Sequence, residues 1–333
     1  MKTTTLAFLI CIATIIKLSA QEIRIGIIGL DTSHSPAFVK SINKENKSEE
    51  FNGFRVTAAY PYGSKSIQSS YERIPQYTED VKKYGVEIVE SIADLLKKTD
   101  VILLETNDGN LHLEQALEVF KAGKRVFIDK PVAGNLTDAI LIFQLAKRYN
   151  VPLFTSSSLR YSTSTSEVAA GKYGKVNGVF TFSPAKTEPS HGRFAWYGIH
   201  GIEALYAVMG RGCQQVVCSY SEGADVITGT WSDGPVATFR ALRTGKTDYN
   251  GIAFCENKIV PMGDYMGYDV LLIEIAKFFK TGVSPIDPEE TLELFTFMEA
   301  AEESIRIGGK PVSIEATYRA ALKKAEARIS TMK

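Results

Sequence analysis

The chain has 333 residues, of which 44% are hydrophobic and 23% are charged. These fractions are typical of a globular protein and exclude disordered, collagen-like and coiled-coil chains. Lys and Arg together number 38, as do Asp and Glu, so the formal net charge is zero. With no basic run, the sequence excludes a surface for nucleic acid or anionic membrane. Four cysteines exclude a disulfide scaffold, and Cys213 and Cys218 either pair with each other or lie buried as free thiols.

Residues 1–20 have the pattern of a secretory signal peptide. Lys2 precedes an apolar stretch at 6–18, and the small residues Ser19 and Ala20 follow it. The stretch is shorter than a bilayer-spanning helix and is interrupted by Lys17, so we expect cleavage after Ala20 and no stable membrane span. No twin-arginine pair is present, which favours export in the unfolded state. The sequence predicts a periplasmic or extracellular protein.

Residues 21–155 alternate apolar runs with amphipathic segments. Each run is rich in β-branched residues and is followed by a helical pattern, which is typical of buried parallel strands with crossover helices. The sequence predicts an α/β domain with a doubly wound parallel sheet, whose ligands bind beyond the carboxyl ends of the strands. The main predicted strands are 22–29, 54–60, 101–105, 125–129 and 151–157.

The pattern changes near residue 160, where segments alternate between apolar and polar residues. Such alternation is typical of antiparallel strands with one covered face. We therefore predict an α+β domain over 156–312 with a large, mostly antiparallel open sheet. An amphipathic C-terminal helix is predicted at 313–333.

Several local strings stand in a characteristic order. They are IRIGIIG from residue 23, DKP at 129–131, Arg160-Tyr161, YGIHGIE at 197–203 and FMEAAEESIRIGGKPV from residue 297. In this order the chain resembles the Gfo/Idh/MocA oxidoreductase family over residues 22–312. The resemblance implies a Rossmann-like domain joined to an α+β domain, NAD(P) as cofactor, a sugar or cyclitol substrate, and a homo-oligomer formed through the open sheet.

The first βα turn departs from the G-x-G-x-x-G pattern of dinucleotide-binding domains. Its three positions are Gly29, Asp31 and His34. A carboxylate at the second position would repel a pyrophosphate. Tyr60 stands where the family has an acid for the ribose hydroxyls. The sequence therefore predicts that NAD(P) is not bound in the usual way, which agrees with export in the unfolded state.

The predicted catalytic residues are Lys130, His200 and Glu203. In the family, the lysine of E-K-P contacts the reacting hydroxyl, and here Lys130 precedes Pro131, which we expect to follow a cis bond. The resemblance also implies a histidine at His200 with an acid nearby, Glu203. A partly buried lysine and a histidine are suited to acid/base chemistry near neutral pH.

Polar and aromatic residues of the second half are predicted to bind substrate, because a carbohydrate needs many hydrogen bonds and a flat apolar surface. Trp196 replaces the aspartate that the family pairs with its histidine, so an indole that stacks on a sugar is expected there. The predicted substrate-binding residues are Arg160, Tyr161, His191, Trp196 and Tyr197, with Lys186 and Arg193 as weaker candidates.

Carboxylates and histidines also gather after the predicted strands. One interpretation is a divalent metal such as zinc or manganese, bound by Asp31, His34, Glu105 and His112, with Asp108 and His191 in reserve. A second is a metal-free acid/base set around Lys130 and His200. A third is that Asp31 and His34 only cap the first helix.

Together these features predict an exported enzyme that acts on a small carbohydrate. Acid/base chemistry by Lys130 and His200 predicts a lyase- or hydrolase-like reaction on a sugar, ketosugar or glycoside. One alternative is an NAD(P)-dependent sugar oxidoreductase, as the family resemblance implies. The other is a sugar-binding protein without catalytic activity.

Overall fold

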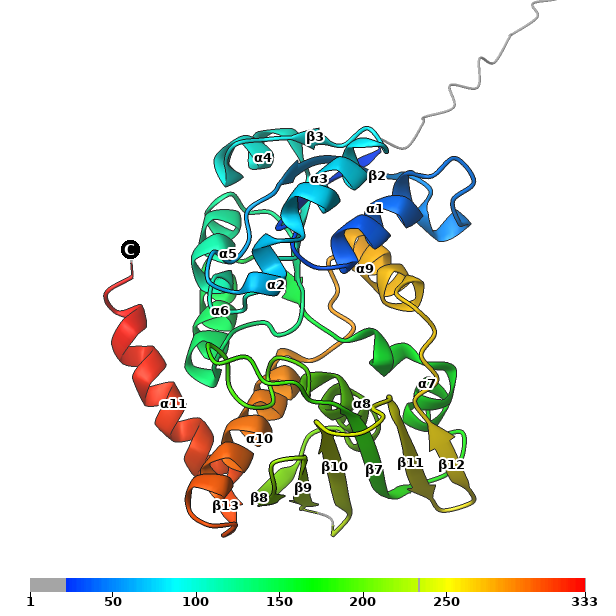
Figure 1. The fold of residues 1–333 in the computed structure, drawn as a ribbon, viewed down its shortest axis with the longest axis vertical. Coiled ribbons are helices and arrows are strands. Elements are labelled where there is room, and N and C mark those ends of the chain that lie inside the picture. The colour runs from blue at the N-terminus through cyan, green and yellow to red at the C-terminus, as the bar shows by residue number, and fades with distance from the viewer. Residues whose placement is uncertain (1–21, 233, 333) are drawn as a thin grey trace, which may run out of the picture.

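The computed structural model describes residues 22–232 and 234–332. The chain forms two sheets, one above the other in Figure 1, joined by loops and helices. The predicted signal peptide at 1–20 lies outside the described residues. Within the described ranges, every helix is too short or too polar to cross a lipid bilayer.

The first sheet is parallel and six-stranded, in the order β3-β2-β1-β4-β5-β6, as predicted for a doubly wound domain. Strand order reverses next to β1, between β1 and β4. Its strands are β1 (Ile23–Ile28), β2 (Phe54–Tyr60), β3 (Glu87–Ile88), β4 (Val101–Leu104), β5 (Val126–Ile128) and β6 (Leu153–Phe154).

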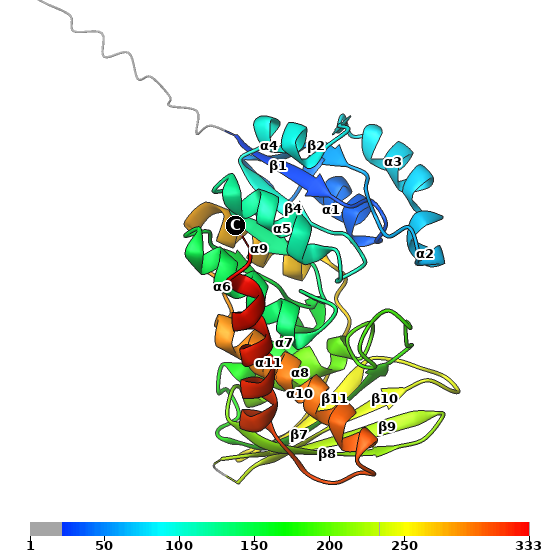
Figure 2. The same cartoon turned by 90° about the vertical axis from the view of Figure 1, so that its left-hand side faces the viewer.

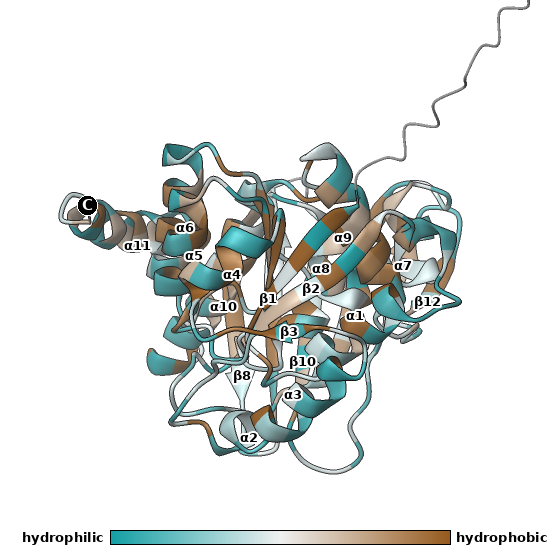
Figure 3. Cartoon of the chain, turned by 90° about the horizontal axis from the view of Figure 1, so that it is seen from above, coloured by the Kyte–Doolittle hydropathy of each residue, from teal (hydrophilic) through white to brown (hydrophobic). Residues whose placement is uncertain are grey.

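Helices cover both faces of this sheet. One face packs against α4, α5 and α6, and the other against α1 and α9. In Figure 3 the strand β1 is brown between helices that carry teal segments, as expected for strands buried on both faces. The helices are α1 (His34–Asn43), α2 (Gln68–Tyr71), α3 (Ile74–Lys82), α4 (Ile92–Lys98), α5 (His112–Lys121), α6 (Leu136–Arg148) and α9 (Asp269–Thr281), with a short 3-10 turn η1 (Glu49–Phe51).

The second sheet has seven strands in the order β12-β11-β7-β10-β9-β8-β13. All of its pairs are antiparallel except β7 with β10. The mostly antiparallel open sheet predicted from the sequence is therefore confirmed. The strands are β7 (Val176–Pro184), β8 (Cys213–Tyr220), β9 (Ala224–Trp231), β10 (Val236–Leu242), β11 (Asn250–Cys255), β12 (Ile259–Met262) and β13 (Val312–Ser313).

One face of the second sheet carries helices and the other is open (Figure 2). Cys213, Cys218 and Cys255 are buried free thiols, so the structure favours burial over pairing. The remaining elements are η2 (Ser158–Tyr161), α7 (Thr163–Ala169), α8 (Ile199–Met209), α10 (Pro288–Arg306) and α11 (Ile314–Ile329).

Two C-terminal helices pack against elements of the first domain. Leu271, Leu272 and Phe278 of α9 join the core of the first domain, although α9 lies within the range 156–312 predicted for the second. Helix α11 lies against both α6 and α10. Apolar faces at helical spacing identify these elements in the sequence, but the surface that each one covers is set by tertiary packing.

Candidate active site

A cleft of about 500 Å³ lies between the two domains, beyond the carboxyl ends of the first sheet. Its walls come from the β1–α1 turn, the loops after β4 and β5, and the start of α8. A cavity of about 700 Å³ between α10 and α11 is larger, but it lies away from the ends of the parallel strands and is lined by neither a lysine nor a histidine. We therefore place the candidate active site in the 500 Å³ cleft, where ligands of such sheets bind.

Lys130 reaches the cleft from the loop that follows β5. The peptide bond between Lys130 and Pro131 is cis, as predicted from the sequence. Lys186, a weaker sequence candidate, also lines the cleft. The cleft therefore carries positive charge on both domains.

His200 lies in the first turn of α8 and lines the same cleft. Its Nδ1 is 2.8 Å from Ser157 Oγ. Burial lowers the pKa of His200 well below its usual value, and the positive charge of Lys130 acts in the same direction. The ring is therefore neutral at neutral pH, and when Nδ1 donates to Ser157 its Nε2 is a proton acceptor.

Aromatic side chains form one wall of the cleft. Trp196 and Tyr197, which the sequence predicts to bind substrate, both line it. Sequence reasoning missed Tyr249, Tyr265 and Tyr268, which come from loops near β11 and α9 and line the same cavity. Nothing local in the sequence distinguishes these three tyrosines, because only the fold brings their loops to the cleft.

The structure places Arg160 and Glu203 in an ion-pair cluster and not among the residues that line the cleft. Arg160 Nε donates to Glu203 Oε2 at 2.8 Å, and its Nη1 is 2.6 Å from Glu290 Oε1. This arrangement favours a structural role for both residues over the predicted catalytic and substrate-binding roles. Tyr161 is also absent from the lining of the cleft, and burial raises the pKa of its hydroxyl.

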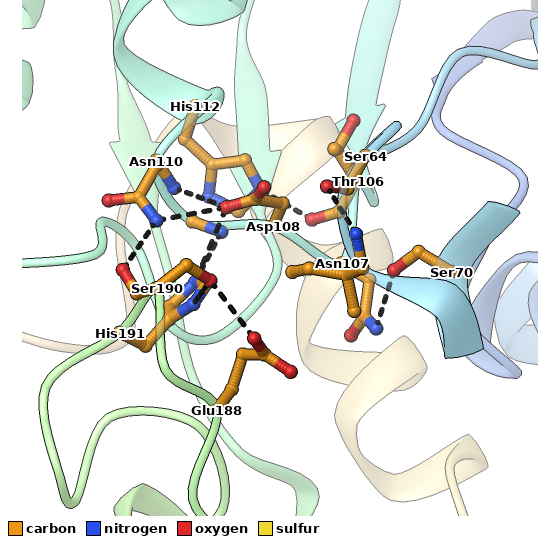
Figure 4. Close-up of polar contacts among 12 residues, drawn as sticks. Ser64, Ser70, Thr106, Asn107, Asp108, Asn110, His112, Glu188, Ser190 and His191 are labelled. Atoms are coloured by element: carbon orange, nitrogen blue, oxygen red, sulfur yellow. Dashed lines mark hydrogen bonds and ion pairs between the residues drawn. The ribbon is translucent and has the colours of Figure 1, made fainter.

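His191 positions Trp196 and does not line the cleft itself. Its Nε2 accepts the backbone N–H of Gly109 at 3.1 Å and lies 3.5 Å from Asp108 Oδ1 (Figure 4). Burial lowers the pKa of His191, which keeps the ring nitrogen free to accept. The two rings are 4.9 Å apart, so His191 connects the loop after β4 to the indole.

The predicted metal ligands do not come together as a set. His112 faces carbonyl oxygens with both ring nitrogens, Nε2 at 2.6 Å from Thr106 and Nδ1 at 3.2 Å from Val132. Both nitrogens are engaged with the backbone, so His112 is not available to bind a metal. His34 and Glu105 do lie together, and the residue that joins them is Asp129. Asp129 is not among the metal ligands predicted from the sequence, because there it stands only as the neighbour of Lys130.

The residues of the first βα turn decide whether a dinucleotide fits against it. Gly29 has φ +94°, and a Cβ there would meet the backbone N of Thr106 at 2.4 Å, so the tight turn needs glycine. Asp31 is fully buried, and its carboxylate accepts the backbone N–H of Asn107 at 3.0 Å and of Ser64 at 3.4 Å. The hydrogen bond from Asn107 joins the loop after β4 to the loop after β1. It therefore crosses the crevice between these strands, where strand order reverses.

The same carboxylate is packed tightly on its other side. A Cβ at Gly63 would lie 2.4 Å from Asp31 Oδ2, so no space remains beside it. Burial raises the pKa of Asp31 to about 6, which leaves it mostly ionised at neutral pH. Tyr60, at the end of β2, stacks on Tyr62 and offers no carboxylate for a ribose. These residues do not fit a diphosphate bound across the turn.

A doubly wound parallel domain, an open second sheet and a cleft with lysine and histidine between them define a two-domain α/β architecture. Residues 23–157 match the family described as "Oxidoreductase family, NAD-binding Rossmann fold", which is the Gfo/Idh/MocA family. The match covers the N-terminal domain, and the resemblance predicted from the sequence is confirmed over these residues.

A curated relative is an uncharacterized oxidoreductase, YhhX, of Escherichia coli (strain K12), 24% identical over 139 residues. The match spans 38% of this chain and 40% of that protein.

Solved structures share the whole architecture. A probable dehydrogenase from Thermotoga maritima has a TM-score of 0.71 at 20% identity, over 89% of this chain and 100% of that one. Scyllo-inositol dehydrogenase from Lactobacillus casei, solved with NAD(H) and scyllo-inositol, has a TM-score of 0.71 at 16% identity with the same coverage. At these identities the similarity establishes the fold.

Proposed function

We propose that this protein is an enzyme that acts on a small carbohydrate by acid/base chemistry, with Lys130 and His200 as its catalytic residues. The observation that carries the proposal is their position: a lysine and a neutral histidine line one cleft together with Trp196, Tyr197 and three further tyrosines. Aromatic faces suit the C–H surface of a sugar, and the polar groups suit its hydroxyls.

The reaction favoured is proton abstraction beside a carbonyl. His200 Nε2 takes the proton, the C–H electron pair forms a C=C bond, and the carbonyl π pair moves to oxygen, next to the positive charge of Lys130. When the carbonyl re-forms, the C=C pair of the enolate becomes a double bond between Cα and Cβ, and the pair of the breaking Cβ–O bond leaves with the β-oxygen substituent. The proton held by His200 protonates that leaving group. Water added across the double bond in the reverse sense gives hydrolysis. No oxidant or reductant is consumed.

Deuterium incorporation tests this step without knowledge of the product. The full chain is incubated with a ketoglycoside in D2O, and exchange beside the carbonyl is followed by mass spectrometry. We expect Lys130→Met and His200→Asn each to slow exchange about 10²- to 10⁴-fold, as for loss of a general acid or base. Lys310→Met, at an exposed lysine outside the cleft, is the matched control. Exchange that continues unchanged in both cleft variants contradicts these roles.

The second candidate is an NAD(P)-dependent oxidoreductase of a sugar or cyclitol, which the family match over residues 23–157 favours. It predicts quenching of protein fluorescence and saturable binding on titration with NADH, and reduction of NAD⁺ in the presence of a polyol. The Asp31 geometry favours the first candidate, as does export, which is part of our proposal and rests on residues 1–20. Micromolar binding of NADH would reverse this preference.

A further inference from the structure

Three ionisable side chains meet below the floor of the cleft, and the proposed reaction does not use them. His34 is the first residue of α1, Glu105 follows β4, and Asp129 follows β5. Because β1, β4 and β5 are parallel neighbours, their carboxyl ends place the three groups at one edge of the sheet. His34 Nδ1 lies 2.9 Å from Asp129 Oδ2 and 3.8 Å from Glu105 Oε2.

Both carboxylates are buried, and among the described residues Glu105 has no close partner while Asp129 faces only His34. Glu105 is 0% exposed and Asp129 is 1% exposed. Within the described residues, none of their four oxygens makes a hydrogen bond, and neither does His34 Nδ1. Lys130 is the nearest lysine that acts on both charges, yet it forms no ion pair within 4 Å with either. A buried carboxylate in this state is strongly unfavourable unless a cation or a bound proton neutralises it, and burial raises the pKa of Glu105 well above its usual value.

The donor set and its spacing suit a divalent cation. Three ligand atoms, one from each residue, lie within 4.8 Å of one another. A tetrahedral ion with bonds of about 2.0–2.1 Å separates its ligand atoms by about 3.3 Å, and the two measured separations of 2.9 and 3.8 Å lie on either side of that value. As metal ligands, one imidazole nitrogen and two carboxylates together supply the charge of −2 that a divalent ion balances.

We propose that His34 Nδ1, Glu105 and Asp129 bind a divalent cation of the zinc or manganese class. His34 lines the cleft beside Lys130, so this site borders the cleft through its histidine. Three protein ligands with one open position are the arrangement of a catalytic rather than a structural zinc site. An ion there would hold and polarise a sugar oxygen. The site differs from the sequence prediction in that Asp129 takes the place of Asp31 and His112.

Metal content of the purified full chain tests this directly, without any assay of activity. The protein is stripped with EDTA, mixed with equimolar ZnCl2 or MnCl2 and passed over a desalting column, and bound metal is measured by mass spectrometry. We expect one equivalent in the wild type and a rise in melting temperature that EDTA reverses. Glu105→Gln and His34→Gln should each weaken binding at least about 100-fold.

Two matched variants keep the test specific. Asp31→Asn changes a buried carboxylate of the same turn, and Glu203→Gln changes a buried carboxylate across the cleft, and both should bind metal as the wild type does. Circular dichroism checks that the Glu105 and His34 variants are folded. If one of them is not, the absorption spectrum of bound Co²⁺ in the wild type reports whether a nitrogen–oxygen site forms. A wild type that retains neither zinc nor manganese, or that binds them as strongly after both substitutions, overturns the proposal.

Discussion

Two groups of buried charge lie on opposite sides of the cleft and are built differently. On the second domain's side, Arg160 contacts both Glu203 and Glu290, so each charge has a partner within 2.8 Å. On the first domain's side, no Arg or Lys within 4 Å pairs with Glu105 or Asp129 among the described residues, and the only basic side chain within that distance is His34, 2.9 Å from Asp129. Burial alone therefore does not identify a functional carboxylate in this protein. The distinguishing feature is whether the fold itself neutralises the charge.

The largest effect on stability is expected at the paired group. Arg160→Met would leave Glu203 and Glu290 buried without their cation, and we expect the free energy of unfolding to fall by about 3–5 kcal/mol. Urea denaturation followed by circular dichroism measures it. The double variant Arg160→Met/Glu203→Gln should recover part of the loss. A single variant as stable as the wild type would show that the pairing contributes nothing.

Asp31 represents an intermediate case, a carboxylate held only by backbone amides. Its folded pKa of about 6 is above its usual value of 3.8, so the folded state binds the proton more tightly than the unfolded state. This contribution to stability is present below about pH 4 and is lost as the pH rises through 6, by up to about 3 kcal/mol. Asp31→Asn should remove this part of the pH dependence. Urea denaturation of both proteins between pH 4 and 7 checks the sign, and parallel curves would contradict it.

The smallest expected effect is a difference in the free energy of unfolding between two isosteric substitutions, compared in metal-stripped protein. Glu203→Gln weakens a charged hydrogen bond to Arg160 and should lower the free energy of unfolding by about 1–3 kcal/mol. Glu105→Gln replaces a buried carboxyl group that has no hydrogen-bond partner, so we expect no loss within about 1 kcal/mol, or a gain. Thermal melts in EDTA compare the two. Equal losses would mean that the two groups do not differ as the structure indicates.

The sequence predicts the order of elements well, because β-branched runs and helical periodicity are local signals. The strand at 54–60 is reproduced residue for residue in β2, and the strand predicted at 101–105 corresponds to β4. The short strands β12 and β13 were missed, since a few paired residues carry little pattern of their own. The parallel pairing of β7 with β10 was also missed, because register between distant strands is not a local property.

In the candidate active site, the sequence predicts the residues that belong to recognisable strings and misses the others. Lys130 and His200 are in the cleft because the strings DKP and YGIHGIE fix their positions in the fold. Glu203 belongs to the same string, yet its carboxylate contacts Arg160. A string identifies a segment, and the direction of each side chain depends on contacts that only the folded chain has.

Helices α9 and α11 hold the two domains together. Each follows the second sheet's strands in the chain yet returns to the first domain, α9 into its core and α11 along α6, where Arg328 pairs with Asp138. A hinge motion that separates the two walls of the cleft would break the contacts that α9, α11 or both make with the first domain. We therefore expect the distance between the two walls to change little when a ligand binds.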